Sequence, residues 1–148
     1  MIITKLPEVG TSIFAVMSKM ANDHNAINLS QGFPDFNCSN ELIELVNHFM
    51  KLGHNQYAPM PGTAELRKQI AFKVKRDYNR DYNPDNEITV TAGATQALYS
   101  AFSSIVNPGD EVIIFEPAYD SYIPAIVVNG GIPVPIKLEN DTFKIPWD

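Results

Sequence analysis

One stretch of the chain, residues 88–99 with the sequence ITVTAGATQALY, limits the possible folds more than any other. All three residues at 88–90 are branched at Cβ, which favours an extended strand. Gly93 permits a backbone turn that a side chain would obstruct. From Thr95 onward, apolar residues recur at helical spacing. The stretch is therefore predicted to form a strand, a tight turn and a helix in direct succession.

Such a joint can serve either as a binding site or as a purely structural turn. The first N–H groups of a helix have no partner within the helix, and the helix dipole favours negative charge there. A phosphate group fits that environment. Strand–glycine–helix joints are also common in α/β proteins as packed turns with no ligand. The joint alone leaves both interpretations open.

Composition narrows the class of protein and its partners. Of the 148 residues, 45% are hydrophobic and 19% are charged, which is typical of a globular protein. The net charge of −6 disfavours binding to nucleic acid or to an anionic membrane. Cys38 is the only cysteine, so no disulfide can form within the chain. Since no segment resembles a signal peptide or a membrane span, we expect a cytoplasmic protein.

The first half of the chain is predicted to be helical. Apolar periodicity predicts helices at 11–24, 40–52 and 63–78. Ser39 is expected to cap the second helix and Gly53 to end it. The apolar side chains of that helix are predicted to face inward, and they are Leu42, Ile43, Val46 and Phe49.

From residue 87 the predicted pattern is β-α-β-α-β, which is typical of an α/β fold with a parallel sheet. Residues 111–115, EVIIF, are continuously apolar in their centre, as expected for a strand that is buried on both faces. Residues 132–138 are predicted to form another strand. Pro133 and Pro135 place that strand at the edge of the sheet, because proline has no N–H to donate.

Several familiar catalytic motifs are missing from the sequence. It contains no glycine-rich nucleotide loop, no G-x-S-x-G elbow and no H-E-x-x-H pair. The three histidines lack the spacing of metal ligands, so no metal site is expected. Tyr119 follows the strand at 111–115 and should lie at the edge of the sheet where ligands collect. Together with Gly93–Thr95, it could hold a phosphorylated aromatic cofactor, or it could pack in an ordinary interface.

Four segments of the chain carry a resemblance to a known family. They are INLSQGFPDF (27–36), NQYAPMPGTAELRKQIA (55–71), ITVTAGATQALY (88–99) and GDEVIIFEPAYDSYIPAI (109–126). In this order they resemble the class I aminotransferases, which are fold-type-I enzymes dependent on pyridoxal 5′-phosphate. The resemblance is strongest to bacterial methionine aminotransferases and kynurenine/glutamine transaminases. It extends over nearly the whole chain.

The resemblance implies roles for individual residues. It implies a phosphate cradle formed by Gly93, Ala94 and Thr95. Tyr119 would stack on the pyridine ring, and Gly32 would lie beside the substrate carboxylate. Tyr57 would reach the phosphate bound by a neighbouring subunit, so a homodimer with shared sites is expected. The bond between Glu116 and Pro117 is a candidate cis peptide.

The resemblance also implies an incomplete enzyme. Residues 1–37 would form an N-terminal arm and a segment of the small domain, and residues 38–148 the first part of the pyridoxal-phosphate-binding large domain. The Schiff-base lysine of the family lies later in its sequences, and none of the lysines here lies in a matching motif. We therefore expect no catalytic residue in this chain, weak cofactor binding, low stability and no turnover by the chain alone.

Three interpretations of such a chain stay open. It could be the N-terminal portion of an aminotransferase that acts on a sulfur-containing or aromatic amino acid and a 2-oxo acid. It could be a non-catalytic phosphate-binding or dimerisation module, or one half of a split enzyme that binds a complementary C-terminal fragment. It could also belong to a relative with β-lyase or decarboxylase chemistry, since one fold supports several reactions.

Overall fold

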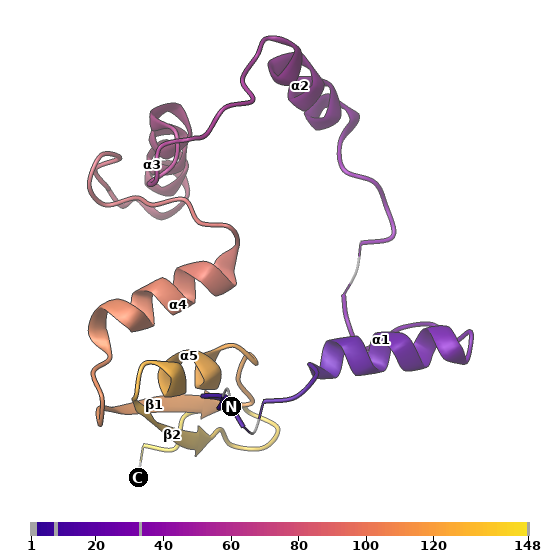
Figure 1. Cartoon of the computed structure of the whole chain (residues 1–148), viewed down its shortest axis with the longest axis vertical. Helices are drawn as coiled ribbons and strands as arrows, with labels where there is room; N and C mark the ends of the chain where they lie inside the picture. Colours follow the sequence, from indigo (N-terminus) through magenta and orange to yellow (C-terminus); the bar gives the residue numbers. More distant parts are fainter. Residues whose placement is uncertain (1–2, 8, 33, 148) are drawn as a thin grey trace. The chain divides into compact units, whose positions relative to one another are not determined.

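The computed structural model describes residues 3–7, 9–32 and 34–147 (Figure 1). Within these ranges the elements are, in order, α1 (Ile13–Asp23), α2 (Asn40–Lys51), α3 (Ala64–Tyr78), α4 (Ala94–Ile105), β1 (Glu111–Glu116), α5 (Tyr122–Val128) and β2 (Ile132–Lys137). The chain divides into two compact units. One unit combines Met1–Ser30 with Ala92–Asp148, and the other is Gln31–Thr91. The predicted boundary between an arm at 1–37 and a large domain at 38–148 stays a prediction.

β1 and β2 form a parallel pair that begins with Glu111 opposite Ile132. The N–H of Ile132 donates to the carbonyl oxygen of Asp110 at 2.8 Å, so the even-numbered residues of both strands turn their backbone groups toward each other. Pro133 and Pro135 occupy the alternate positions of β2. Their missing N–H groups therefore cost no hydrogen bond to β1, and the predicted edge position is confirmed.

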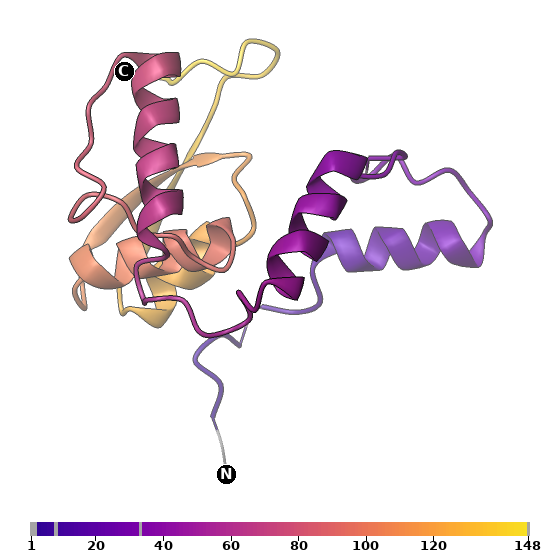
Figure 2. The same cartoon turned by 90° about the horizontal axis from the view of Figure 1, so that it is seen from above.

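The buried core of this unit is small and lies where α5 covers the strands (Figures 1 and 2). Among the described residues, the buried apolar side chains are Ile114, Ala125 and Ile126. The expectation that β1 is buried on both faces is wrong, because Ile113 is 64% exposed. Only β2 pairs with β1 in the described part of the chain, and α5 is the only helix in contact with the strands.

The predicted strand at 88–90 is also absent. Residues 88–90 pair with no strand of the described chain. One backbone hydrogen bond is given for them, from the N–H of Val90 to the carbonyl oxygen of Pro61 at 3.0 Å. A strand needs a neighbour for its N–H and C=O groups, and the described ranges offer residues 88–90 none. The β-branched residues therefore do not become part of a sheet. The helix predicted after them is present as α4.

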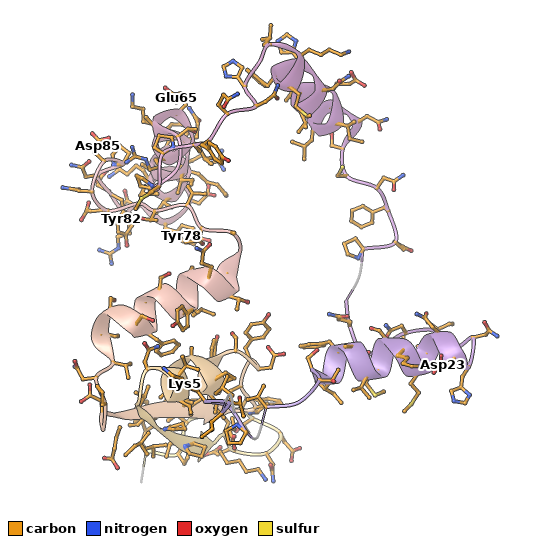
Figure 3. The ribbon with its side chains drawn as sticks, in the orientation of Figure 1. Lys5, Asp23, Glu65, Tyr78, Tyr82 and Asp85 are labelled. Carbon is orange, nitrogen blue, oxygen red and sulfur yellow. The ribbon has the colours of Figure 1, made fainter. Side chains whose placement is uncertain are left out.

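In the unit Gln31–Thr91, Arg67 of α3 holds the loop that follows the helix. Its Nη1 donates to the carbonyl oxygen of Pro84 and lies 3.8 Å from Oδ1 of Asp85. Figure 3 shows this loop turning back so that Asp85 lies beside α3. The Arg67 side chain is only 11% exposed, so these contacts form with little competition from water.

α2 has the predicted position but not the predicted burial. Ser39 is its N-cap, although the hydroxyl makes no capping hydrogen bond, and Gly53 follows the helix with a φ of +89°. The expectation that its apolar residues face inward is wrong, since Leu42, Ile43, Val46 and Phe49 are all exposed. In the ranges described, no other element packs against α2. Across the same ranges, no helix has both the length and the apolarity to cross a bilayer.

Candidate functional site

The N-terminus of α4 is built around Gly93. This residue is the N-cap, with φ +93° and ψ 166°, a conformation that residues with a side chain rarely adopt. The first hydrogen bond of the helix runs from the N–H of Ala97 to the carbonyl oxygen of Gly93 at 3.3 Å. The N–H groups of Ala94, Thr95 and Gln96 therefore precede the intrahelical bonds and are available to an outside acceptor.

A side chain from within the helix supports this turn. The N–H of Ala92 donates to Oε1 of Gln96 at 2.6 Å. The N-cap itself offers no side-chain oxygen, because it is a glycine. The first turn of α4 contains no acidic residue. The three residues that the resemblance assigns to the cradle, Gly93, Ala94 and Thr95, thus lie in a turn whose own residues include no carboxylate to offset the helix dipole.

Tyr119 lies in the same unit, after β1 and a cis peptide bond between Glu116 and Pro117. The predicted cis bond is confirmed. The ring of Tyr119 meets that of Tyr122 edge-on, with centroids 5.9 Å apart and an interplanar angle of 68°. Tyr119 is 48% exposed, so among the described residues it is not enclosed in an ordinary packed interface. Its ring retains surface on which a flat ligand could stack.

An apolar groove of about 550 Å³ is lined by residues of α4 and α5. Thr95 and Gln96 line it from α4, and Ser121 lines it from the start of α5. Oγ of Ser121 is buried and has no hydrogen-bond partner. Leu6 also lines the groove, so residues from both chain segments of the unit meet beside the cradle.

Tyr57 and Gly32 lie in the other unit. The side chain of Tyr57 is fully exposed, and a Cβ built on Gly32 would meet nothing within 4 Å. Their assigned roles, at the phosphate of a neighbouring subunit and at the substrate carboxylate, stay predictions. The structure thus brings Gly93, Ala94, Thr95 and Tyr119 into one compact unit and leaves these two outside it.

Sequence reasoning missed Gln96. The residue had been included only as part of the helix, although glutamine at the third helical position is one half of the capping-box pattern. It also missed the role of Arg67, which the sequence places within the helix predicted at 63–78 and nothing more. Nothing in the sequence around Arg67 predicts its contact with Pro84, because that contact depends on the path of the loop after the helix.

Comparison with known proteins defines the family. The model of the family "Aminotransferase class I and II" matches residues 24–148. The chain therefore belongs to the class I and II aminotransferases.

Two curated relatives cover almost the whole chain. It is 51% identical over 144 residues to the methionine aminotransferase of Escherichia coli K12, covering 97% of this chain and 37% of the relative. It is 40% identical over 150 residues to a probable N-succinyldiaminopimelate aminotransferase, DapC, of Mycobacterium tuberculosis, covering 100% of this chain and 38% of the relative. The chain thus spans less than two-fifths of the length of these relatives.

Solved structures agree with this assignment. The chain superposes on E. coli YbdL, identified as a methionine aminotransferase, with a TM-score of 0.94 and 50% identity, over 99% of this chain and 38% of that one. For the N-succinyldiaminopimelate aminotransferase of M. tuberculosis the TM-score is 0.90 at 38% identity, over 100% and 38%. The chain has the fold of part of a fold-type-I aminotransferase. Family membership implies pyridoxal phosphate as the cofactor of the full-length enzymes.

Proposed function

We propose that this chain provides the phosphate-binding part of a pyridoxal-phosphate-dependent aminotransferase acting on a sulfur-containing or aromatic amino acid and a 2-oxo acid. The observation that carries the proposal is the uncovered first turn of α4, behind a glycine at φ +93°, in a chain 51% identical to a methionine aminotransferase. The amino donor follows from that relative and from the resemblance to kynurenine/glutamine transaminases. A cytoplasmic location is part of the same proposal.

The residues of the cradle fit a phosphate. Ala94 and Thr95 offer backbone N–H groups ahead of the first intrahelical bond, and the hydroxyl of Thr95 can donate as well. Nothing lies within 4 Å of the position that a Cβ on Gly93 would take, so an anion can approach the backbone there. Hydrogen bonds to a charged group contribute about 1.5–3 kcal/mol each, so a few of them support weak binding.

The remaining assigned residues would complete the site. The exposed ring of Tyr119 would stack on the cofactor ring, a contact worth about 0.5–1.5 kcal/mol beyond the area it buries. Tyr57 of a second copy would reach the phosphate, and Gly32 would leave room for the substrate carboxylate. A side chain as exposed as that of Tyr57 is free to contact a second copy, which supports the proposed homodimer.

The bound cofactor supplies an electron sink that allows an amino group to pass between an amino acid and a 2-oxo acid. The residues of this chain bind and orient it. Of the four segments that carry the resemblance, only the one at 55–71 contains a lysine, Lys68, which lies on α3 and belongs to no cofactor-binding motif. We therefore propose that these 148 residues alone bind the cofactor weakly and turn over no substrate.

The second candidate function is one half of an enzyme made of two chains. The exposed apolar side of α2 and the outer edge of β1, which no other described strand pairs with, favour it, because both surfaces would be covered by a complementary C-terminal fragment. A non-catalytic phosphate-binding or dimerisation module would use the same surfaces. β-Lyase or decarboxylase chemistry would depend on residues that a complementary fragment supplies.

Titration of the chain with pyridoxal phosphate, followed by ³¹P NMR, tests the cradle. We expect saturable broadening of the phosphate signal, and weaker binding by Thr95→Ala than by the control Ser103→Ala, which changes an exposed hydroxyl later in α4. Equal binding by both variants would contradict the role of Thr95. No binding by the unchanged chain would contradict the function.

A turnover assay tests whether the chain is inactive alone and active together with a complementary fragment. The chain alone, with methionine or kynurenine and a 2-oxo acid, should give no product above the blank. Addition of the separately expressed remainder of the E. coli methionine aminotransferase should restore transamination if the chain acts as one half of an enzyme. Turnover by the chain alone would refute the proposed inactivity, and no turnover in the mixture would count against the second candidate function.

A further inference from the structure

We propose that Leu6 is a positioning residue, which attaches the N-terminal segment (residues 3–7 and 9–12) to the apolar groove lined by α4 and α5 and couples this segment to the phosphate site. The inference rests on the proposed function, because it concerns the same phosphate. The juxtaposition that carries it is that Leu6 and Thr95 line one groove of about 550 Å³. Attachment of the segment and binding of a phosphate therefore stabilise each other.

Leu6 is the point at which the N-terminal segment meets the rest of its unit. Among the residues described between 3 and 13, the side chain of Leu6 is half-buried and every other side chain is exposed. Ile3 and Val9 are equally apolar, yet they are 85% and 51% exposed. Within this stretch, apolar surface is thus removed from water mainly at Leu6.

The local backbone leaves Leu6 suited to this contact. Its N–H donates to Oγ1 of Thr4 at 3.1 Å, and its carbonyl oxygen accepts from the N–H of Val9 at 3.2 Å. Both backbone groups of Leu6 are therefore satisfied inside the segment. The side chain can lie against the groove without leaving a backbone polar group unpaired.

The groove presents both helices to this side chain. Tyr99 and Thr95 line it from α4, and Pro124 and Val128 line it from α5. The two helices also pack against each other. A side chain held between two helices restricts their motion relative to one another, and a ligand that binds an already ordered site loses less conformational entropy. Because Thr95 belongs to the first turn of α4, this restriction acts on the residue proposed to hold the phosphate.

The attachment also matters for α1. This helix begins at Ile13, shortly after Leu6, and belongs to the same compact unit as α4 and α5. In the ranges that the structure describes, α1 packs against no other helix or strand. The contact of Leu6 with the groove therefore links α1, through the chain, to the helices beside the proposed phosphate site.

Trypsin measures the attachment directly. Lys5 is exposed, and the bond between Lys5 and Leu6 can enter the protease only after Leu6 leaves the groove. Inorganic phosphate at matched ionic strength should slow the release of residues 1–5 by about fivefold, since coupling between two sites is reciprocal. Inorganic phosphate is the probe because the aldehyde of pyridoxal phosphate reacts with lysine amines. Cleavage after Lys51, in the other unit, is the internal control and should keep its rate.

Three variants of the 148-residue chain test the role of the side chain. Leu6→Ala should speed cleavage after Lys5, remove the effect of phosphate on it, and weaken phosphate binding by about fivefold. Leu6→Met is apolar and of similar volume, so it should restore all three properties. Ile3→Ala removes an equally apolar side chain that does not line the groove, and it should behave as the unchanged chain does.

The outcomes separate this inference from the proposed function. If the unchanged chain binds phosphate but is cleaved after Lys5 at the same rate with and without it, Leu6 is an attachment point uncoupled from the site, and the inference is overturned while the proposed function stands. It is also overturned if Leu6→Ala binds phosphate normally, or if Ile3→Ala binds as weakly as Leu6→Ala. If the unchanged chain binds neither inorganic phosphate nor pyridoxal phosphate, the proposed function fails, and the inference fails with it. Slower cleavage with phosphate that is lost in Leu6→Ala and regained in Leu6→Met supports both.

Discussion

Val90 lies directly against the backbone of Gly62. A Cβ on residue 62 would come within 2.7 Å of Cγ2 of Val90, and the N–H of Val90 donates to the carbonyl oxygen of Pro61 at 3.0 Å. These two contacts attach the segment that leads toward the cradle to the turn before α3. The segment is held at this point by a close approach of two backbones, without a sheet.

We predict that Gly62→Ala destabilises the chain by about 2–4 kcal/mol, through the clash with Val90 and the positive φ of residue 62. Denaturant unfolding measures this loss. The matched control is Gly53→Ala, because Gly53 has a φ of +89° and nothing within 4 Å of its Cβ position. Gly53→Ala should lower the free energy of unfolding by less, because it introduces only the strain of a positive φ and no clash. Equal losses would show that the approach of Val90 contributes nothing.

Arg67→Met should destabilise the unit Gln31–Thr91 by about 1–3 kcal/mol, because the carbonyl oxygen of Pro84 loses its donor. Faster amide exchange in the loop at 83–87 would accompany the loss. Lys68→Met changes the neighbouring, exposed side chain and should have little effect on either measurement. A similar loss in both variants would attribute the effect to the removal of a positive charge from α3 and not to the contact with Pro84.

Asp77 makes the stability of α3 depend on pH. Hydrogen bonds from Arg76, and then from Lys73, hold the pKa of this carboxyl below its usual value. A lowered pKa in the folded state contributes stability above the unfolded value of about 3.9, and this contribution is lost as the pH falls through the folded pKa. Asp77→Asn should therefore lower the melting temperature at pH 7, and the difference should shrink in acid as the pH falls below the unfolded value of about 3.9 and through the lowered pKa of Asp77.

The control for this prediction is Asp120→Asn. Among the described residues, the carboxylate of Asp120 takes part in no ion pair. Its replacement should leave the melting temperature unchanged at pH 7. If the melting temperatures of Asp77→Asn and the unchanged chain still differ in acid, the charge of Asp77 is not the cause of the difference.

The outer edge of β1 should promote self-association. Since the even-numbered residues of β1 face β2, the N–H and C=O groups of the odd-numbered residues point away from it, and Ile113 among them is 64% exposed. Ile113→Lys should reduce concentration-dependent association in sedimentation velocity. Ile132→Lys changes a similarly exposed side chain on β2, whose outer edge carries the two prolines. If both variants reduce association equally, exposed apolar side chains cause the association and the outer edge of β1 has no special role.

Local features of the chain were predictable from the sequence. The helix expected at 63–78 is α3, Ala64–Tyr78, and the helix expected after Gly93 begins at Ala94. The cis bond before Pro117 followed from the resemblance and is present. The prolines of β2 correctly indicated an edge. Each of these depends on residues within about four positions of one another or on a motif that the family carries intact.

Features that need a second segment were predicted wrongly or missed. Residues 88–90 have strand-forming side chains but no neighbouring strand, and β1 has the apolar sequence of a fully buried strand but a cover on one side only. The contact of Gln96 with Ala92 and that of Arg67 with Pro84 depend on how the backbone turns, which apolar periodicity does not report.

The sequence by itself determined the order of the elements, the family and the position of the candidate cradle, because local propensity and a preserved motif are properties of consecutive residues. Only the tertiary structure decided which N–H groups of that cradle are open. Gln96 reaches back to Ala92, while Ala94 and Thr95 precede the first bond of α4. The physical reason is that a hydrogen bond is set by distance and direction in space, and these exist only once the turn at Gly93 has formed.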